Sequence, residues 1–281
     1  MGADKIKSYA KLNLALNVTG KNSSLHKIET IIVFISLHDE ILIEKINSNK
    51  HKISFTGKFS KNIGKNNTVS KLLNILDEKK LLNNKKFKVR IKKRIPSKAG
   101  LGGGSMNASN ILNYFLKKDI IKISKKEVIK ISKLVGSDVL LGLNPTSSIL
   151  SGNNEIKRFY NCKKFYSLIV KPQFGCSTRE IYSKVKKFNK PKFNNPNLKM
   201  FNFNYLKKMD NSLEPIALSK YSKLRKIKSF LETLSKPSFV RMTGSGSALV
   251  AYFQSKYRCE IAQKMFRKKY KNYWCILSKT I

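Results

Sequence analysis

The amino-acid sequence predicts an α+β fold in two lobes. The chain opens with runs of β-branched and aromatic residues that are typical of antiparallel strands, and amphipathic helices follow. A glycine-rich segment at residues 100–105 joins a strand to a strongly periodic helix. A second series of strands and helices starts near residue 153 and does not repeat the first. In 281 residues, this organisation predicts an N-terminal domain over residues 1–155 and a C-terminal domain over residues 156–281.

The first lobe is expected to start with strands and to continue with helices. The strands are expected where branched and aromatic residues recur, at residues 6–18, 28–37, 40–46, 53–55 and 87–91. The helices are expected where apolar residues fall three or four positions apart, at residues 68–76, 108–116 and 125–135. The strand at residues 87–91 ends before Pro96, so the glycine-rich segment lies between a strand and a helix.

The second lobe mixes the same two patterns. Strands are expected at residues 166–170, 239–242, 248–253 and 273–277, and helices at residues 178–185 and 256–268 with two more across 211–234. Residues 187–204 are rich in Asn, Lys and Pro, which predicts an irregular surface loop. The chain ends with a strand–turn–strand segment followed by a helix and a strand, which agrees with an α+β fold.

The glycine-rich segment predicts a phosphate-binding loop. Successive glycines let backbone N–H groups converge on an anion, and the start of the following helix adds partial positive charge. No Gly-Lys-Ser/Thr closes the segment, so it is not a Walker loop, and its basic, half-exposed strand does not fit a dinucleotide fold. The alternative is a flexible turn. The residues expected to hold phosphate are Pro96, Ser97, Lys98, Ala99, Gly100, Leu101, Gly102, Gly103, Gly104, Ser105 and Met106.

Four further segments carry candidate site residues, and each has a simpler interpretation. Asp138 lies between a helix and an apolar stretch, and it is either a functional carboxylate or a helix N-cap. Lys11 and Asn13 share one face of a strand, which either lines a polar cleft or faces solvent. The segment 243–247 alternates Gly and Ser between two strands, for close ligand approach or as a hairpin turn. His26 lies in a polar loop, where most histidines are only solvated.

The composition argues for a protein in a reducing compartment and against nucleic-acid recognition. The formal net charge is +42, but only eight of the 58 basic residues are Arg and the lysines run from end to end. Lys, Asn and Ile are encoded by AT-rich codons. Genome-wide drift in base composition therefore explains the positive charge better than nucleic-acid recognition does, because nucleic-acid recognition favours Arg. The four cysteines form no C-x-x-C pair. No apolar run is long enough for a membrane span and no signal peptide is evident, so a cytoplasmic location is expected.

Taken in order, these segments resemble the motifs of the GHMP kinase superfamily. The loop spelling G-L-G-G-G-S followed by Asn-Ala is most similar to the branch that phosphorylates a cytidine diphosphate-linked methylerythritol. Homoserine and mevalonate kinases usually have G-L-G-S-S-A instead. The matching segments are residues 10–14 (AKLNL), 18–20 with His26, 96–108, 136–139 (GSDV), 211–215 (NSLEP) and 242–247 (MTGSGS).

The resemblance implies an S5-like N-terminal domain, a ferredoxin-like C-terminal domain and an ATP-dependent small-molecule kinase of isoprenoid precursor biosynthesis. It implies that Asp138 is the base near the 2-hydroxyl of the substrate, with Lys11 beside it, and that the glycine loop holds the ATP phosphates. It also implies that His26 hydrogen-bonds the cytosine and that Tyr182 stacks on it. The remaining residues implied to contact the substrate are Asn13, Gly244, Ser245 and Gly246.

Two departures from the family pattern bear on affinity. Leu25 replaces the family's Tyr before the His, which removes an aromatic stack, and Met106 replaces the second Ser of the loop. Mg²⁺ is expected with ATP, with no protein ligand assigned, and a monomer or weak homodimer is expected. The alternatives are another GHMP kinase such as homoserine kinase or, in a different class, an RNA-binding protein that uses the basic surface.

Overall fold

The computed structural model describes residues 2–22, 25–152 and 155–281. Packing divides the chain into two compact units, each assembled from several stretches of sequence. Unit 1 takes Met1–Ala10, Leu37–Ser97 and Gly102–Pro145. Unit 2 takes Lys11–Ser36, Lys98–Leu101 and Thr146–Ile281. The expected domain boundary at residues 155 and 156 stays a prediction, because these units describe packing and not a single division of the chain.

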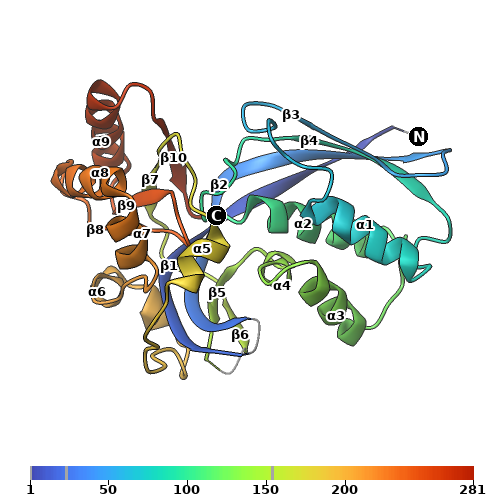
Figure 1. Ribbon diagram of the computed structural model, residues 1–281, viewed down its shortest axis with the longest axis horizontal. Helices are drawn as coiled ribbons and strands as arrows, with labels where there is room; N and C mark the ends of the chain where they lie inside the picture. The colour runs from blue at the N-terminus through green and yellow to red at the C-terminus, as the bar shows by residue number, and fades with distance from the viewer. Residues whose placement is uncertain (1, 23–24, 153–154) are drawn as a thin grey trace. The chain divides into compact units, whose positions relative to one another are not determined.

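Unit 1 is a sheet with helices packed against it. Strand β3 (Lys52–Thr56) runs parallel to β4 (Lys86–Lys92), and β4 runs antiparallel to residues 40–46 of β2 (His26–Ile46). Strand β1 (Asp4–Lys21) also pairs with β2. The helices of unit 1 gather on one side of these strands in Figure 1 and share a buried apolar core with them. They are α1 (Thr68–Glu78), α2 (Gly103–Lys117), α3 (Lys125–Val135) and α4 (Val139–Gly142).

Local sequence sets the ends of these helices. Asn67 caps α1, because its side chain accepts hydrogen bonds from the amides of Val69 and Ser70 while its own amide donates to the Ser70 hydroxyl. The side chain of Ser124 caps α3 by accepting from the amide of Glu127, and α3 stops at Gly136 as the sequence predicts. Helix α2 begins differently, since its N-cap Gly102 is left-handed and has no side chain. The start of α2 therefore leaves its first amides without a capping side chain.

The sheet of unit 2 has the ferredoxin-like order. Four antiparallel strands lie in the order β10-β7-β9-β8. Helix α8 (Ser222–Thr233) lies in the sequence between β7 and β8, and α9 (Lys256–Lys269) lies between β9 and β10. This β-α-β-β-α-β sequence with the fourth strand beside the first is the ferredoxin-like arrangement, which confirms that expectation. The strands are β7 (Tyr166–Lys171), β8 (Phe239–Met242), β9 (Leu249–Phe253) and β10 (Trp274–Lys279).

The rest of unit 2 includes a second set of paired strands and several short helices. Residues 30–32 of β2 pair with β5 (Ser147–Leu150), and β5 pairs with β6 (Ile156–Phe159). A single apolar core joins the four-stranded sheet to α7, α8 and α9. The shorter helices are α5 (Thr178–Ser183), η1 (Leu198–Phe201), α6 (Phe203–Lys207) and α7 (Glu214–Lys220).

Three sequence-based expectations were wrong in detail. Residues 28–37 and 40–46 form one continuous strand, because Asp39 is satisfied by internal partners and does not break β2. Strands β5 and β6 were not predicted, because each has only four residues. The irregular loop at 187–204 ends early, because the Asn197 side chain caps η1 by accepting from the amide of Lys199.

A histidine whose side chain is only 8% exposed links α1 to the β3–β4 pair in unit 1. The Nδ1 atom of His51 accepts from the amide of Phe87 at 3.0 Å, and its Nε2 atom lies 3.1 Å from Oδ2 of Asp77. Lys86 lies 2.6 Å from the same carboxylate oxygen. Burial lowers the pKa of His51, and the carboxylate of Asp77 only partly opposes that shift. The folded protein therefore favours the neutral ring.

We expect this histidine to make unit 1 sensitive to acid. Because the folded pKa lies below the usual value of 6.5, the stabilisation is complete above that value and is lost as the pH falls through the folded pKa. Thermal unfolding of wild type and His51→Asn should be compared between about pH 7.5 and about pH 5. The wild type should lose more melting temperature than the variant, whose amide oxygen can still accept from Phe87. An equal loss in both proteins would contradict the prediction.

Candidate active site

The first cluster of site residues lies in unit 2, where Lys11 and Asn13 are both buried on β1. The Nζ atom of Lys11 donates to Oδ1 of Asn13 at 2.5 Å. The amide group of Asn13 in turn donates to the hydroxyl of Thr30 at 2.9 Å. The interpretation of this strand face as solvated is therefore wrong. A cation held in place by a buried amide is suited to binding an anionic or hydroxyl-bearing ligand.

The middle of the glycine loop is fixed against the same strand. The amide of Lys11 donates to the carbonyl of Leu101 at 3.1 Å. The hydroxyl of Thr243 accepts from the amide of Asn13 at 3.0 Å and donates to the carbonyl of Gly100 at 3.2 Å. Gly100 has φ +74°, and a Cβ atom there would lie 1.9 Å from the carbonyl oxygen of Thr243. Only glycine allows this approach of two backbones.

The Gly-Ser turn after β8 is held by hydrogen bonds from the segment at residues 211–215. The side chain of Asn211 donates to the carbonyls of Met242 and Gly244, at 2.8 Å each. The carboxylate of Glu214 accepts from the amide of Met242 at 2.8 Å. Asn211 and Glu214 belong to the segment 211–215, which the sequence singled out without assigning a role. Their contacts show that this segment holds the turn at residues 243–247 in position.

The last part of the glycine loop lies in unit 1 and forms the start of α2. Gly103, Gly104 and Ser105 make up its first turn, so their amides have no partner within the helix. The hydroxyl of Thr68 donates to the carbonyl of Gly104 at 2.7 Å and ties this turn to α1. Uncapped amides at the N-terminus of a 15-residue helix are suited to binding phosphate. This part of the loop is therefore the first turn of a helix and not a flexible turn, and phosphate binding there stays a prediction.

Met106 differs from its neighbours in the loop. Its amide already donates to the carbonyl of Gly102 at 2.9 Å. Its side chain is fully buried, and a Cβ atom on Gly142 would lie 2.7 Å from its sulfur. These contacts favour a packing role, in which Met106 fills the space above Gly142 and holds α4 against α2. Its assignment to nucleotide binding stays a prediction that its own contacts do not favour.

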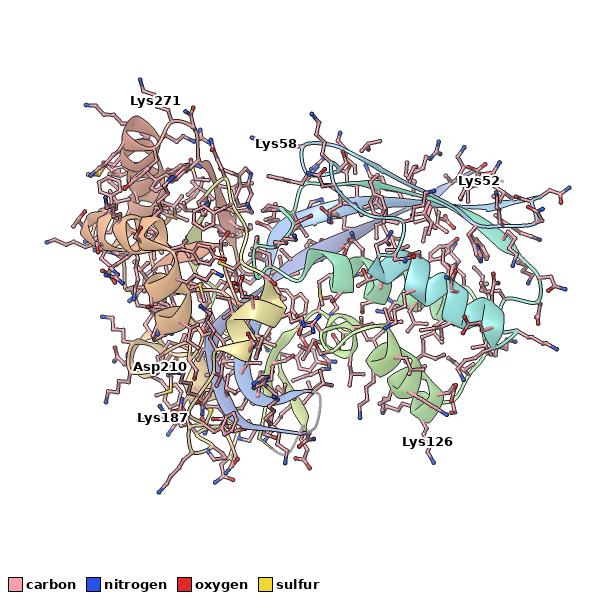
Figure 2. The ribbon with its side chains drawn as sticks, viewed as in Figure 1. Lys52, Lys58, Lys126, Lys187, Asp210 and Lys271 are labelled. Atoms are coloured by element: carbon pink, nitrogen blue, oxygen red, sulfur yellow. The ribbon has the colours of Figure 1, made fainter. Side chains whose placement is uncertain are left out.

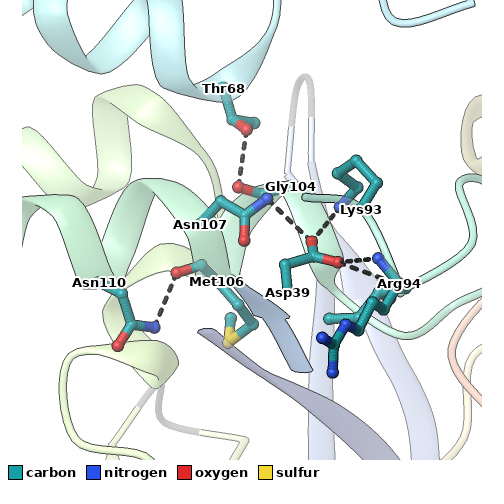
Figure 3. A network of polar contacts seen from close by, with 9 residues as sticks. Asp39, Thr68, Lys93, Arg94, Gly104, Met106, Asn107 and Asn110 are labelled. Atoms are coloured by element: carbon teal, nitrogen blue, oxygen red, sulfur yellow. Dashed lines mark hydrogen bonds and ion pairs between the residues drawn. The ribbon is translucent and has the colours of Figure 1, made fainter. Parts of the chain in front are cut away.

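A buried carboxylate that the sequence did not single out supports the loop in unit 1 (Figure 3). Asp39 has no exposed surface. Its Oδ1 atom accepts from the amides of Arg94 and Ile95, at 2.7 and 2.8 Å, just before the loop begins. Its Oδ2 atom accepts from the side chain of Asn107 on α2 at 3.0 Å and from Lys93. One side chain therefore fixes the strand end that enters the loop and the helix that leaves it.

Asp138 lies at the start of α4 in unit 1. It occupies the N-cap position of this four-residue helix, but its side chain makes no capping hydrogen bond. The capping role considered for Asp138 is therefore wrong, although its position at a helix start is right. The preceding Gly136 faces α2, because its Cβ position lies 3.7 Å from the hydroxyl of Ser105. The structure thus brings the segment that carries Asp138 next to the first turn of α2.

His26 lies among aromatic rings in unit 2 and not in open solvent. The centroid of its ring lies 5.1 Å from that of Tyr182 and 6.3 Å from that of Phe188. Partial burial lowers the pKa of His26, and the positive charge of Lys21 lowers it further. A neutral imidazole offers one donor and one acceptor, which suits the polar edge of a nucleobase. Tyr182 was expected beside His26, and Phe188 was not.

The expected site residues therefore form one group in unit 2 and another in unit 1. In unit 2, Asn13 lies beside Gly244, and Ser245 forms a 2.9 Å hydrogen bond with Thr178 at the start of α5. In unit 1, the helical end of the loop lies beside the segment that carries Asp138. The roles of all these residues, and the expected pairing of Lys11 with Asp138, stay predictions.

The described residues do not include a group of three or more His, Cys, Asp or Glu side chains that could hold a metal ion. Mg²⁺ that is bound with a nucleotide takes most of its ligands from phosphates and water, so it needs no such group. Mg²⁺ bound with ATP stays a prediction. No helix within the described part of the chain is long and apolar enough to cross a bilayer.

Comparisons with known proteins agree with this geometry. Residues 67–152 match the family described as GHMP kinases N terminal domain. The 4-diphosphocytidyl-2-C-methyl-D-erythritol kinase of Pelagibacter ubique is 58% identical over 281 residues, which covers 100% of both chains. The enzyme of the same name from Clostridium tetani is 31% identical and covers 99% of this chain and 100% of its own. This chain belongs to the 4-diphosphocytidyl-2-C-methyl-D-erythritol kinase family.

A solved structure also confirms the fold of the family. A crystal structure of 4-(cytidine 5'-diphospho)-2C-methyl-D-erythritol kinase superposes with a TM-score of 0.77 at 21% identity, covering 99% of this chain and 100% of that chain. Membership of the family confirms the resemblance to GHMP kinases, the α+β fold and the expectation of an ATP-dependent small-molecule kinase.

Proposed function

We propose that this chain transfers the γ-phosphoryl group of ATP to the 2-hydroxyl of 4-diphosphocytidyl-2-C-methyl-D-erythritol. The observation that carries the proposal is membership of the kinase family over the full length of the chain. The uncapped first turn of α2 supports it, since the free amides of such a turn can bind the phosphate groups of a nucleotide. The aromatic surroundings of His26 support a substrate with a nucleobase, for which homoserine and mevalonate offer no counterpart.

In the proposed reaction, the 2-hydroxyl oxygen forms a bond to the γ-phosphorus while the bond from that phosphorus to the bridging oxygen of ADP breaks. Asp138 accepts the hydroxyl proton, and Lys11 provides positive charge to the reacting groups. Phosphoryl transfer requires mainly positioning and neutralisation of charge, so a rigid loop and a fixed lysine are its main needs. Mg²⁺ bound with ATP would neutralise charge on the phosphates.

We also propose that the enzyme works in the cytoplasm as a monomer or weak homodimer, without a specific nucleic-acid partner. Figure 2 supports the last point, because the labelled lysines extend from elements of both units. Lys52 lies on β3 and Lys126 on α3 in unit 1, and Lys271 follows α9 in unit 2. All three are exposed. Charge spread in this way attracts anions without defining a recognition surface.

A panel of alcohols incubated with ATP and Mg²⁺ tests the proposal. ADP release should depend on 4-diphosphocytidyl-2-C-methyl-D-erythritol and should be absent with homoserine or mevalonate. Turnover of homoserine alone would reassign the chain within the GHMP kinases. Structure-dependent RNA binding that persists at physiological salt, without turnover of any alcohol, would instead support the RNA-binding alternative.

A further inference from the structure

We propose that Phe188 forms a second aromatic wall of the nucleobase site, and that Glu29 holds it there through residues 187–193, here called the clamped loop. This inference rests on the proposed function and deepens it, because it assigns base recognition to a residue outside the motifs. All of the residues involved lie in unit 2.

The need for a second wall follows from the surroundings of His26. Tyr182 provides one ring at 5.1 Å, inclined 40° to the imidazole. Leu25, next to His26, is 68% exposed and offers no ring. A planar base bound at the polar edge of His26 would then have an aromatic partner on one side only. Stacking on a second ring would add affinity that does not depend on hydrogen bonding.

Phe188 is placed to supply that ring. Its centroid lies 6.3 Å from that of His26, with the two planes inclined by 56°. It is 47% exposed, so much of its surface is open to a ligand. A large apolar side chain that is half exposed next to a neutral histidine contributes little to the stability of the free protein. A bound pyrimidine would cover that surface.

The loop that carries Phe188 is held by a buried carboxylate. Glu29 on β2 has no exposed surface. Its Oε1 atom accepts from the amide of Lys192 at 2.5 Å and from the side chain of Asn17 at 2.7 Å. Its Oε2 atom accepts from the amide of Phe193 at 3.0 Å. Burying a carboxylate is costly unless it is satisfied, so these contacts fix the far end of the clamped loop.

The near end of the loop is held by β1. The amide of Asn189 donates to the carbonyl of Val18 at 2.9 Å, and its side chain donates to Oδ1 of Asn17 at 2.7 Å. The side chain of Asn17 also donates to the carbonyl of Lys190 at 3.0 Å. Phe188 directly precedes these anchored residues. The segment is thus rigid immediately beside the ring, although its Asn- and Lys-rich sequence suggests a loose surface loop.

The test compares CDP binding by titration calorimetry in wild type, Phe188→Ala, Phe188→Tyr and Tyr257→Ala. We expect Phe188→Ala to raise the Kd for CDP about tenfold and the KM for the substrate similarly, with the KM for ATP unchanged. Phe188→Tyr should restore binding, because it restores a ring. Tyr257, 70% exposed on α9, is the matched control, and its removal should change nothing.

The positioning role of Glu29 needs a separate measurement. In Glu29→Gln, an NH₂ group replaces one of the two carboxylate oxygens that accept hydrogen bonds. That group cannot accept from the N–H donors it faces, so the clamped loop should become less rigid. Trypsin should then cleave after Lys187, which Figure 2 labels on this loop, faster than in wild type or Phe188→Ala. The Kd for CDP should rise, and the Glu29→Gln/Phe188→Ala double variant should bind about as weakly as Phe188→Ala alone.

The outcomes separate this inference from the proposed function. CDP binding by wild type that is unchanged in Phe188→Ala would overturn the wall while leaving the kinase assignment intact. Additive losses in the double variant would overturn the positioning role of Glu29. A wild-type enzyme that neither binds CDP nor phosphorylates its cytidine substrate would instead mark a failure of the proposed function.

Discussion

Replacing Asp138 with Asn should lower kcat by about 10²- to 10⁴-fold while ATP still binds. The amide cannot accept the hydroxyl proton, but it has the shape of the carboxylate. Asp138 makes no capping bond to α4, and Asn is as good as Asp at an N-cap, so the helix start should survive. The KM for ATP and the thermal stability should therefore stay close to those of the wild type.

Steady-state kinetics and calorimetric titration of ATP check this expectation. Asp119→Asn is the matched control in the same unit, because Asp119 is exposed and has φ +51°, a conformation that Asn tolerates. Its kcat should equal that of wild type. Near wild-type turnover in Asp138→Asn would remove Asp138 from the role of base.

Asp39→Ala should destabilise the protein by about 3 to 5 kcal/mol. The change leaves Lys93 as a buried cation without its carboxylate, and it removes the acceptor of two backbone amides and of Asn107. The strand end at Ile95 and the start of α2 would lose their common anchor. The folded variant should therefore also show a higher KM for ATP, because we propose that the first turn of α2 binds the ATP phosphates.

Denaturant unfolding and ATP kinetics test this second expectation, and a double variant gives the sharper result. Asp39→Ala/Lys93→Met removes the stranded charge, so it should recover part of the stability that Asp39→Ala loses. Glu40→Ala is the neighbouring control, and it should have a much smaller effect because its partners Lys5 and Arg94 are exposed. Equal stability of the Asp39 single variant and the wild type would show that the network does not support the loop.

The sequence predicted what depends on local pattern. Helical spacing located the start of α1, and Gly136 marked the end of α3, because each signal lies within a few residues. The ferredoxin-like order was expected through the family motifs and is confirmed by the strand pairing.

What the sequence did not predict depends on distant partners. Asp39 accepts from residues 54 to 68 positions away, so its side chain looked like an interruption in a strand and not like an anchor. Glu29 meets its loop partners across 163 and 164 positions. Phe188 lies in a stretch whose composition predicts an irregular surface loop, and no local pattern reveals the buried carboxylate that fixes this loop.

The interleaving of the two units has a consequence for synthesis of the chain. Residues 37–97 and 102–145 complete most of unit 1, whereas residues 11–36 belong to unit 2 and wait for residues 146–281. The amide of Leu16, for example, donates to the carbonyl of Asp210 at 3.0 Å. On a ribosome, the apolar strand segment around Leu16 therefore emerges long before Asp210, and at first only β2 is present to pair with it. We expect nascent chains to expose it until translation is nearly complete, a period in which chaperones or early aggregation compete for it.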